Sequence, residues 1–179
     1  MKPTTEQFNR AMTEAAALAG SPFPSNLYAM ATRDEVYAKF GITAEAAQLF
    51  ETELGTLLLY VHGIQNGWDL IPDGKRAREI LADIERNTLG GLISALKGRV
   101  GIDEHLASRF ASALQARNRL NHGFYERHNF KIDTDEGRDE ILANLEELHT
   151  ELFNAWRVAS TMTVLALQVL EAHQKGVTD

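Results

Sequence analysis

The stretch that decides the fold of this 179-residue chain covers residues 141–170 and reads ILANLEELHTELFNAWRVASTMTVLALQVL. Apolar residues recur in it every three or four positions, which is the spacing of one face of an α-helix. Asp133 and Glu136 are expected to form a capping box at its start. A continuous helix from Thr134 to His173 would be about 60 Å long at about 1.5 Å per residue, so we expect part of it to pack on another chain. The positions in phase are Ile141, Leu145, Leu148, Leu152, Trp156, Ala159, Thr163, Ala166 and Leu170.

Three more helical patterns precede this stretch, and capping or turn residues delimit each of them. The first is expected to begin at Thr43 as its N-cap, and the second at Asp73, whose carboxylate can accept hydrogen bonds from free backbone amides. The second pattern contains Gly90–Gly91, which predicts a kink inside one helix. The third begins near Asp103, and Gly123 is expected to end it in the left-handed conformation.

No segment shows the alternation of apolar and polar residues that is typical of strands, so the expected fold class is all-α. We expect a four-helix up-and-down bundle over residues 42–175, with a short N-terminal helical arm over residues 1–41. Within the arm, short helices are expected at 5–19 and 34–40, the second closed by Gly41.

Composition and charge narrow the classes of function. The chain has no cysteine, which excludes disulfide bonds, a thiol nucleophile and a cysteine-ligated metal. Its formal net charge of −7 argues against a broad basic surface for nucleic acid. We see no signal peptide and no apolar run long enough to span a bilayer, so we expect a cytoplasmic protein with no membrane partner.

The charge is distributed unevenly. Residues 109–131 contain five basic residues and one acidic residue, whereas residues 132–179 contain three basic and ten acidic residues. A local basic site on an acidic body suits a small anionic ligand or a short nucleic-acid segment better than a long duplex. The acidic segment itself is most simply a solvated helix face.

The third helical pattern places polar residues where its apolar face continues. Phe110 and Leu114 mark that face, and the next turn puts Arg117 on it, although arginine is almost never fully buried unless paired. In a straight α-helix, five steps of about 100° place His122 about 140° away from Arg117. The two side chains can therefore act on one target only if the chain unwinds around residues 121–123.

Arg117, Asn118 and His122 form a short sequence motif. In it an arginine is followed directly by a polar residue, and a histidine comes after three further positions. This motif resembles the signature of the HEPN superfamily, whose members are all-α bundles with the motif near the end of the third main helix. The Phe124–Tyr125 pair is also similar to many members. The resemblance covers roughly residues 43–173.

The resemblance implies a metal-independent endoribonuclease, often a toxin or phage-defence effector, that acts as a homodimer with motifs from both subunits at one cleft. The ribose 2′-hydroxyl would attack the adjacent phosphate and leave a 2′,3′-cyclic phosphate. His122 would be the general acid or base, Arg117 would bind the phosphate and stabilise the developing charge, and Asn118 would orient His122 or bind phosphate. Further substrate contacts are expected from Arg119, Tyr125, Arg127 and His128.

The same resemblance implies RNA, such as tRNA or mRNA, as the substrate. It also implies, for a toxin, an antitoxin partner such as a minimal nucleotidyltransferase. No metal or cofactor is expected, because His122 and His128 have no third ligand at a recognisable spacing.

Several alternatives stay open. The chain could be a non-catalytic HEPN-like module for interaction or nucleotide binding, or an unrelated helical regulatory protein. Arg117 could pair with a carboxylate of the last helix, and His122 could be a helix-end residue favoured by the macrodipole. Two copies of Arg117 and His122 facing one cleft would favour catalysis. Arg117 buried against a carboxylate, beside a lone solvent-facing His122, would favour the non-catalytic module.

Overall fold

The structure, a computed structural model, describes residues 31–68 and 71–176, and every regular element in these ranges is helical. The expected all-α fold class is therefore confirmed, while the helix expected at 5–19 lies outside the described residues. The elements are α2 (Arg33–Gln65), α3 (Gly74–Arg86), α4 (Leu89–Lys97), α5 (Glu104–Asn118), the π-helical segment η1 (Arg119–Gly123), α6 (Phe124–Arg127), the 3-10 turn η2 (Lys131–Asp133) and α7 (Asp135–Gly176).

Helix α2 is one uninterrupted helix of 33 residues. It begins after Thr32, whose hydroxyl accepts from the amide of Glu35 while the Glu35 carboxylate accepts from the amide of Thr32. The expectation that one helix ends at Gly41 and another begins at Thr43 is wrong. Thr43 is buried, and its hydroxyl donates to the carbonyl four residues earlier at 2.8 Å, so it bonds within the helix. A glycine such as Gly41 lowers the stability of a helix by only about 1 kcal/mol. Packing of residues 33–41 on the start of α7 offsets this cost, so these residues belong to α2.

The single helix expected across Gly90–Gly91 is instead two helices, α3 and α4. Asp73 caps α3 as predicted, because its carboxylate accepts from the amide three residues on at 2.9 Å. Thr88 caps α4, since its backbone is extended and its hydroxyl accepts from the amide of the second glycine at 3.2 Å. The chain therefore breaks at Asn87–Thr88, and the glycine pair lies in the first turn of α4.

Helix α7 runs for 42 residues, as its continuous apolar stripe predicted. Its start differs from the expected capping box of Asp133 and Glu136: Thr134 caps the helix, with its hydroxyl accepting from the amide of Gly137 at 3.1 Å. A Cβ atom on Gly137 would lie 2.1 Å from the carbonyl oxygen of Lys131. The turn η2 therefore packs directly against the first turn of α7, and only glycine fits there.

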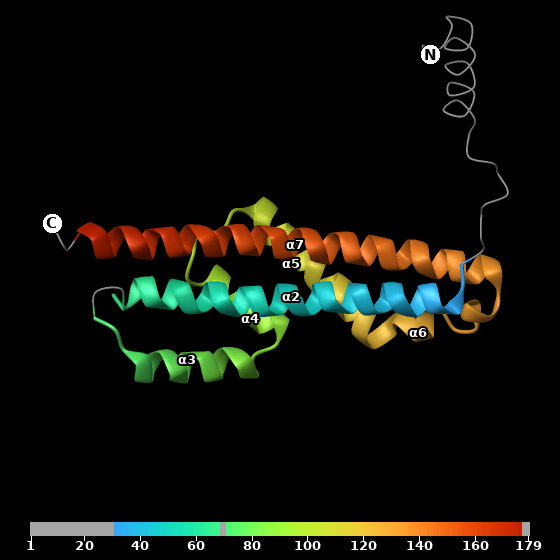
Figure 1. The fold of residues 1–179 in the computed structure, drawn as a ribbon, viewed down its shortest axis with the longest axis horizontal. Coiled ribbons are helices and arrows are strands. Elements are labelled where there is room, and N and C mark those ends of the chain that lie inside the picture. The colour runs from blue at the N-terminus through green and yellow to red at the C-terminus, as the bar shows by residue number, and fades with distance from the viewer. Residues whose placement is uncertain (1–30, 69–70, 177–179) are drawn as a thin grey trace, which may run out of the picture. The chain divides into compact units, whose positions relative to one another are not determined.

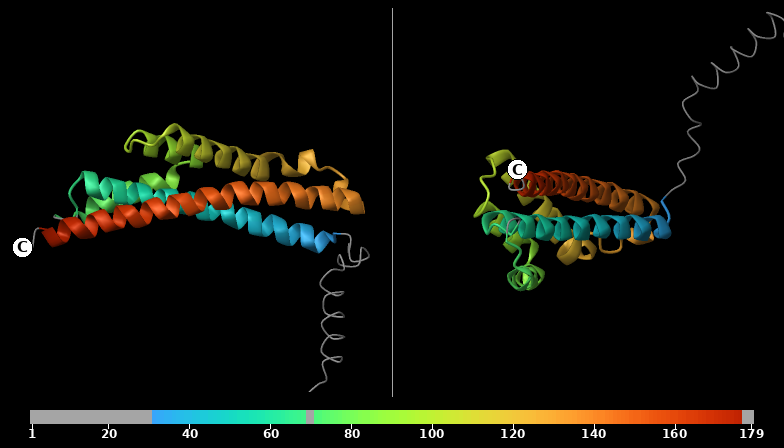
Figure 2. Two further views of the ribbon diagram at one scale, coloured as in Figure 1. Left: turned by 90° about the horizontal axis from the view of Figure 1, so that it is seen from above. Right: turned by 60° about the vertical axis from the view of Figure 1, so that its left-hand side comes forward.

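Helices α2 and α7 lie side by side and run in the same direction (Figures 1 and 2). Near their N-termini Arg33 pairs with Asp133, and toward their C-termini Val61 and Met162 line one groove. In the expected up-and-down bundle of four helices, the first and last helices would be antiparallel. The break between α3 and α4 adds one more segment to the chain path, and the first and last helices become parallel neighbours.

The core lies among α2, α4, α5 and α7. The rings of Phe50 and Phe110 meet at its centre with centroids 5.5 Å apart, and α4 contacts both α2 and α5. The predicted stripe of α7 is buried as far as Ala159, apart from the half-buried Trp156, and is half-buried beyond that point. Leu165 and Val169, which lie beside the stripe, are exposed. The largest fully buried side chains are Phe50, Leu54, Leu57, Leu58, Leu89, Leu96, Phe110, Leu120, Leu145, Leu148 and Leu152.

Candidate functional site

The arginine–histidine motif lies where α5 widens into a π-helix. Helix α5 ends at Asn118, the π-helical segment η1 follows over Arg119–Gly123, and α6 continues from Phe124. Gly123 has φ −137° and ψ 1°, so the expected left-handed helix end at this glycine is wrong. π-Helical turns are rare and are found frequently at functional sites.

Four buried residues explain why the helix widens here. Ala116, Leu120, Phe124 and His128 follow one another at intervals of four, and all are buried. In a regular α-helix each interval of four advances by about 40°, so three intervals would carry the last residue about 120° away from the core. The wider π turn removes part of this drift. The strict four-residue spacing was the signal in the sequence that could have predicted it.

The π turn also changes which residues share a face. Each amide in a π-helix bonds to the carbonyl five residues earlier, rather than four. Residues five apart are therefore closer in direction than the 140° or so of the α-helix. Arg117 and His122 are five apart, and four of the five residues of this segment lie in the interval between them or at its end. Widening of the helix therefore takes the place of the unwinding that we expected.

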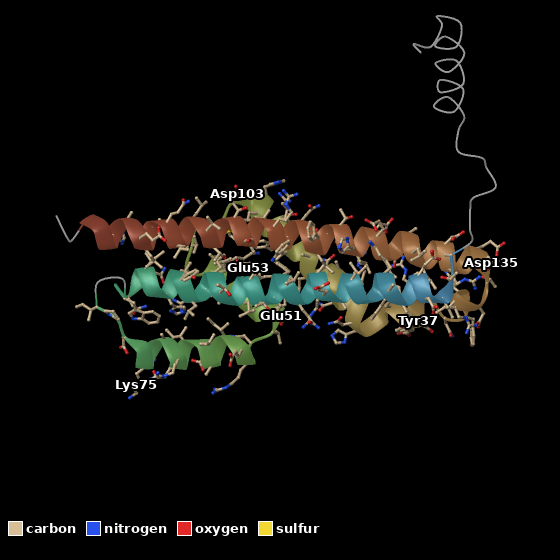
Figure 3. All side chains as sticks on the ribbon, viewed as in Figure 1. Tyr37, Glu51, Glu53, Lys75, Asp103 and Asp135 are labelled. Atoms are coloured by element: carbon tan, nitrogen blue, oxygen red, sulfur yellow. The ribbon has the colours of Figure 1, made fainter. Side chains whose placement is uncertain are left out.

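Arg117 is half-buried and held by two neighbours. Its Nη2 donates to Oε2 of Glu51 in α2 at 3.4 Å, and its Nη1 donates to Oδ1 of Asn118 at 3.3 Å. Its Nε is buried and has no hydrogen-bond partner among the described residues. The carboxylate that pairs with Arg117 thus belongs to α2, about midway along that helix (Figure 3), and not to the last helix.

Glu51 was not identified from the sequence as the partner of Arg117, although the pattern of α2 indicates that its side chain faces the interior. Ala47, Leu54 and Leu58 are all buried. Position 51 lies four residues after the first of them and three and seven residues before the other two, which places it on the same side of α2. An acidic residue among buried apolar positions predicts a buried cationic partner.

His122 and Asn118 are both exposed. Within the residues that the structure describes, His122 makes no hydrogen bond or ion pair, and Asn118 accepts from Arg117 rather than bonding to the imidazole. The expected orientation of His122 by Asn118 is therefore not seen in the single chain.

Three of the four expected substrate contacts lie on the surface. Arg119 donates to the carboxylate of Glu151 in α7 at 3.3 Å and 3.5 Å. Tyr125 is 58% exposed, and its ring centroid lies 5.6 Å from that of Phe40. Arg127 is exposed and makes no ion pair within the described ranges.

His128 does not lie where a phosphate contact was expected. It is only 5% exposed, and its ring centroid lies 4.7 Å from that of Phe124. Its Nε2 lies 3.0 Å from Oδ1 of Asn144 in α7, and its Nδ1 is buried with no hydrogen-bond partner among the described residues. His128 is placed inside the packing of α6 on α7, because the four-residue spacing of buried positions continues through it.

The fold partly neutralises the basic strip of residues 109–131. Three of its five basic side chains pair with carboxylates of α2 or α7, which weakens the local positive field. Lys131 donates to Glu140, and this hydrogen bond is the main reason that the pKa of Glu140 is lowered, with a smaller contribution from Arg127. The pairs are Arg117–Glu51, Arg119–Glu151 and Lys131–Glu140.

Comparison of the chain with models of protein families, with curated proteins and with solved structures finds no match. Among the described residues, no three histidine, aspartate or glutamate side chains are grouped so that they could hold a metal ion. No helix in the same part of the chain combines the length and the apolar character needed to cross a membrane.

Proposed function

We propose that the chain is a metal-independent endoribonuclease of the HEPN type that acts as a homodimer, in the role of a toxin or phage-defence effector. The observation that carries the proposal is the π-helical segment η1, which turns Arg117 and His122 closer to one face. His122 is open to solvent there, and Arg117 is near enough to the surface to meet a phosphate. For a toxin, an antitoxin partner such as a minimal nucleotidyltransferase belongs to the same proposal.

The reaction needs two proton transfers. One proton leaves the attacking 2′-hydroxyl, and another reaches the 5′-oxygen that departs from the phosphorus. Imidazole is suited to both, because it exchanges protons near neutral pH. Each chain offers one exposed histidine in this motif, so two copies of His122 across a two-fold axis would supply the base and the acid, while Arg117 stabilises the charged phosphorane.

The test is cleavage of total RNA and of a labelled tRNA pool in the presence of EDTA. Wild type is compared with His122→Ala and Arg117→Ala, and His105→Ala is the matched control because it removes another exposed histidine from α5. We expect wild type and the control to leave 2′,3′-cyclic phosphate ends, and each motif variant to lose at least about 100-fold in rate. Cleavage that persists in His122→Ala would overturn the proposal.

One observation favours a second function, a non-catalytic HEPN-like module for interaction or nucleotide binding. Arg117 pairs with the Glu51 carboxylate while His122 faces solvent without a partner among the described residues, which is the arrangement that we expected for such a module. A folded homodimer that shows no cleavage of any RNA in the presence or absence of EDTA would decide for this function.

A further inference from the structure

A cavity of about 250 Å³ lies one helical turn beyond the motif, where α6, the turn before α7 and the start of α2 meet. Apolar and aromatic side chains make up most of its wall, including Val36, Phe124, Tyr125 and Phe130, and His128 also lines it. Cavities for drug-sized ligands are roughly 300–1,000 Å³. This one therefore suits a single small ring system.

The hydrogen bonds around His128 determine which of its ring nitrogens carries the proton. The side-chain amide nitrogen of Asn144 donates to the carboxylate of Glu147 at 3.3 Å, which leaves the amide oxygen of Asn144 facing Nε2 of His128 at 3.0 Å. An amide oxygen can only accept, so Nε2 must donate. In the neutral ring, Nδ1 is then an unprotonated acceptor.

That acceptor is buried, and no donor reaches it from the described residues. Buried polar atoms in folded proteins are nearly always hydrogen-bonded, and each exception calls for an explanation. A bound molecule that brings an N–H group is an explanation consistent with the cavity beside the ring.

Phe130 adds a second unusual feature to the same cavity. Its backbone has φ 60°, in the left-handed region, and its ring is 76% exposed. Bulky residues rarely adopt this conformation, and such strained positions cluster at ligand sites. Together with the exposed ring of Tyr125, Phe130 offers the kind of surface on which nucleic-acid bases stack.

We propose that this cavity binds a nucleobase with an exocyclic amino group, such as adenine or cytosine, whose amino group donates to Nδ1 of His128. The base lies against the rings of Tyr125 and Phe130. Because Nδ1 is buried, part of the cavity wall has to move before the base can reach it. We expect the Asn129–Phe130 turn to be that part, since it lines the cavity and Phe130 holds a left-handed conformation that the movement would release. The inference rests on the proposed function only if the base belongs to RNA, since a free nucleotide has the same chemistry.

The experiment compares two ligands that differ only in the amino group. AMP and purine riboside 5′-monophosphate are titrated into the full chain while the imidazole ¹⁵N resonances of His128 are followed by NMR. We expect AMP to shift the Nδ1 resonance and to bind at least about tenfold more tightly than the analogue without the donor. Phe130→Ala should weaken AMP binding, and Phe153→Ala, which removes an exposed phenylalanine from α7, should not.

A short 2′-O-methyl oligoadenylate, which cannot be cleaved by 2′-hydroxyl attack, identifies the source of the base. Tighter binding of the oligonucleotide than of AMP assigns the site to RNA, and equal binding assigns it to a free nucleotide. Equal affinity for AMP and its purine analogue, or no shift of Nδ1 at saturation, overturns the inference. Because binding is measured without cleavage, failure of the proposed nuclease and failure of this site are distinguishable.

Discussion

At the scale of single residues, Glu51 limits what Arg117 can bind. Its carboxylate accepts from Nη2 of the guanidinium, so a phosphate has to compete with it. A partly exposed ion pair of this kind contributes roughly 0–1 kcal/mol. We therefore expect Glu51→Gln to bind 2′-O-methyl RNA up to about fivefold more tightly, as measured by fluorescence anisotropy. Glu53→Gln, on the same helix, is the control, and weaker binding by Glu51→Gln would contradict the competition.

A pair of glycines tests the local packing. A Cβ atom at Gly137 would meet the Lys131 carbonyl oxygen, whereas one at Gly41 would have no neighbour within 4 Å. We expect Gly137→Ala to lower the free energy of unfolding by about 1–3 kcal/mol or more, and Gly41→Ala to raise it by up to about 1 kcal/mol. Urea unfolding measures both. Equal effects of the two substitutions would show that the close approach at the start of α7 is absent.

His62 makes stability depend on pH. Burial lowers the pKa of its imidazole, and the positive charges of Arg99 and Arg76 add to the effect. The unfolded chain therefore binds this proton more readily than the folded chain, and stability rises with pH. The contribution is complete above the ordinary pKa of about 6.5 and is lost as the pH falls below it. We expect the melting temperature of His62→Gln to fall less than that of wild type between about pH 7.5 and pH 5.5; an equal fall would exclude this role.

At the scale of elements, the sequence predicted the helices whose apolar stripe is long and uninterrupted. The stripe of α7 and the Asp73 cap of α3 are confirmed. The break before α4 was missed because the apolar phase runs on from Ile84 to Leu92 across it, and a cap such as Thr88 contributes only about 1 kcal/mol. Whether one helix or two form there depends on packing between segments, which cannot be derived from a single sequence.

The residues of the candidate site also fall into those that the sequence predicted and those that it did not. Arg117, Asn118 and His122 could be found because they form a local motif. The partner Glu51 and the burial of His128 could not be found from the motif, because both depend on contacts with distant helices. The roles of the motif residues in catalysis stay predictions.

The π-helical segment allows a test at this scale. Deletion of Asn121 would convert the buried spacing of four between Leu120 and Phe124 to three, which a regular α-helix accommodates. We expect this variant to remain folded, with a melting temperature close to that of wild type by circular dichroism. Deletion of Ala111, an exposed residue in the regular part of α5, is the control and should unfold the protein, because it rotates every later core position by about 100°. Unfolding by both deletions would contradict our account of the π turn.

At the scale of the whole molecule, the C-terminal part of α7 presents an apolar surface. Leu165 and Val169 are exposed and line a groove of about 360 Å³ against α2. We expect a homodimer in solution that buries this surface. Light scattering at micromolar concentration should give about twice the chain mass of 19.9 kDa. Leu165→Asp should shift the particle to the monomer mass, whereas Thr161→Asp, at another exposed position of α7, should not; a 19.9 kDa wild-type particle would contradict the expectation.

The parallel pairing of α2 and α7 has a consequence for how the chain folds. Ala31 bonds to Asp139 and Thr43 to Leu145, across sequence separations of 108 and 102 residues. Helical proteins whose contacts are mostly local fold within microseconds to milliseconds, and distant contacts slow the search because a long loop must close first. The interface between α2 and α7 is such a contact. During synthesis, α2 therefore has to wait for most of the chain to emerge from the ribosome before it meets its main partner.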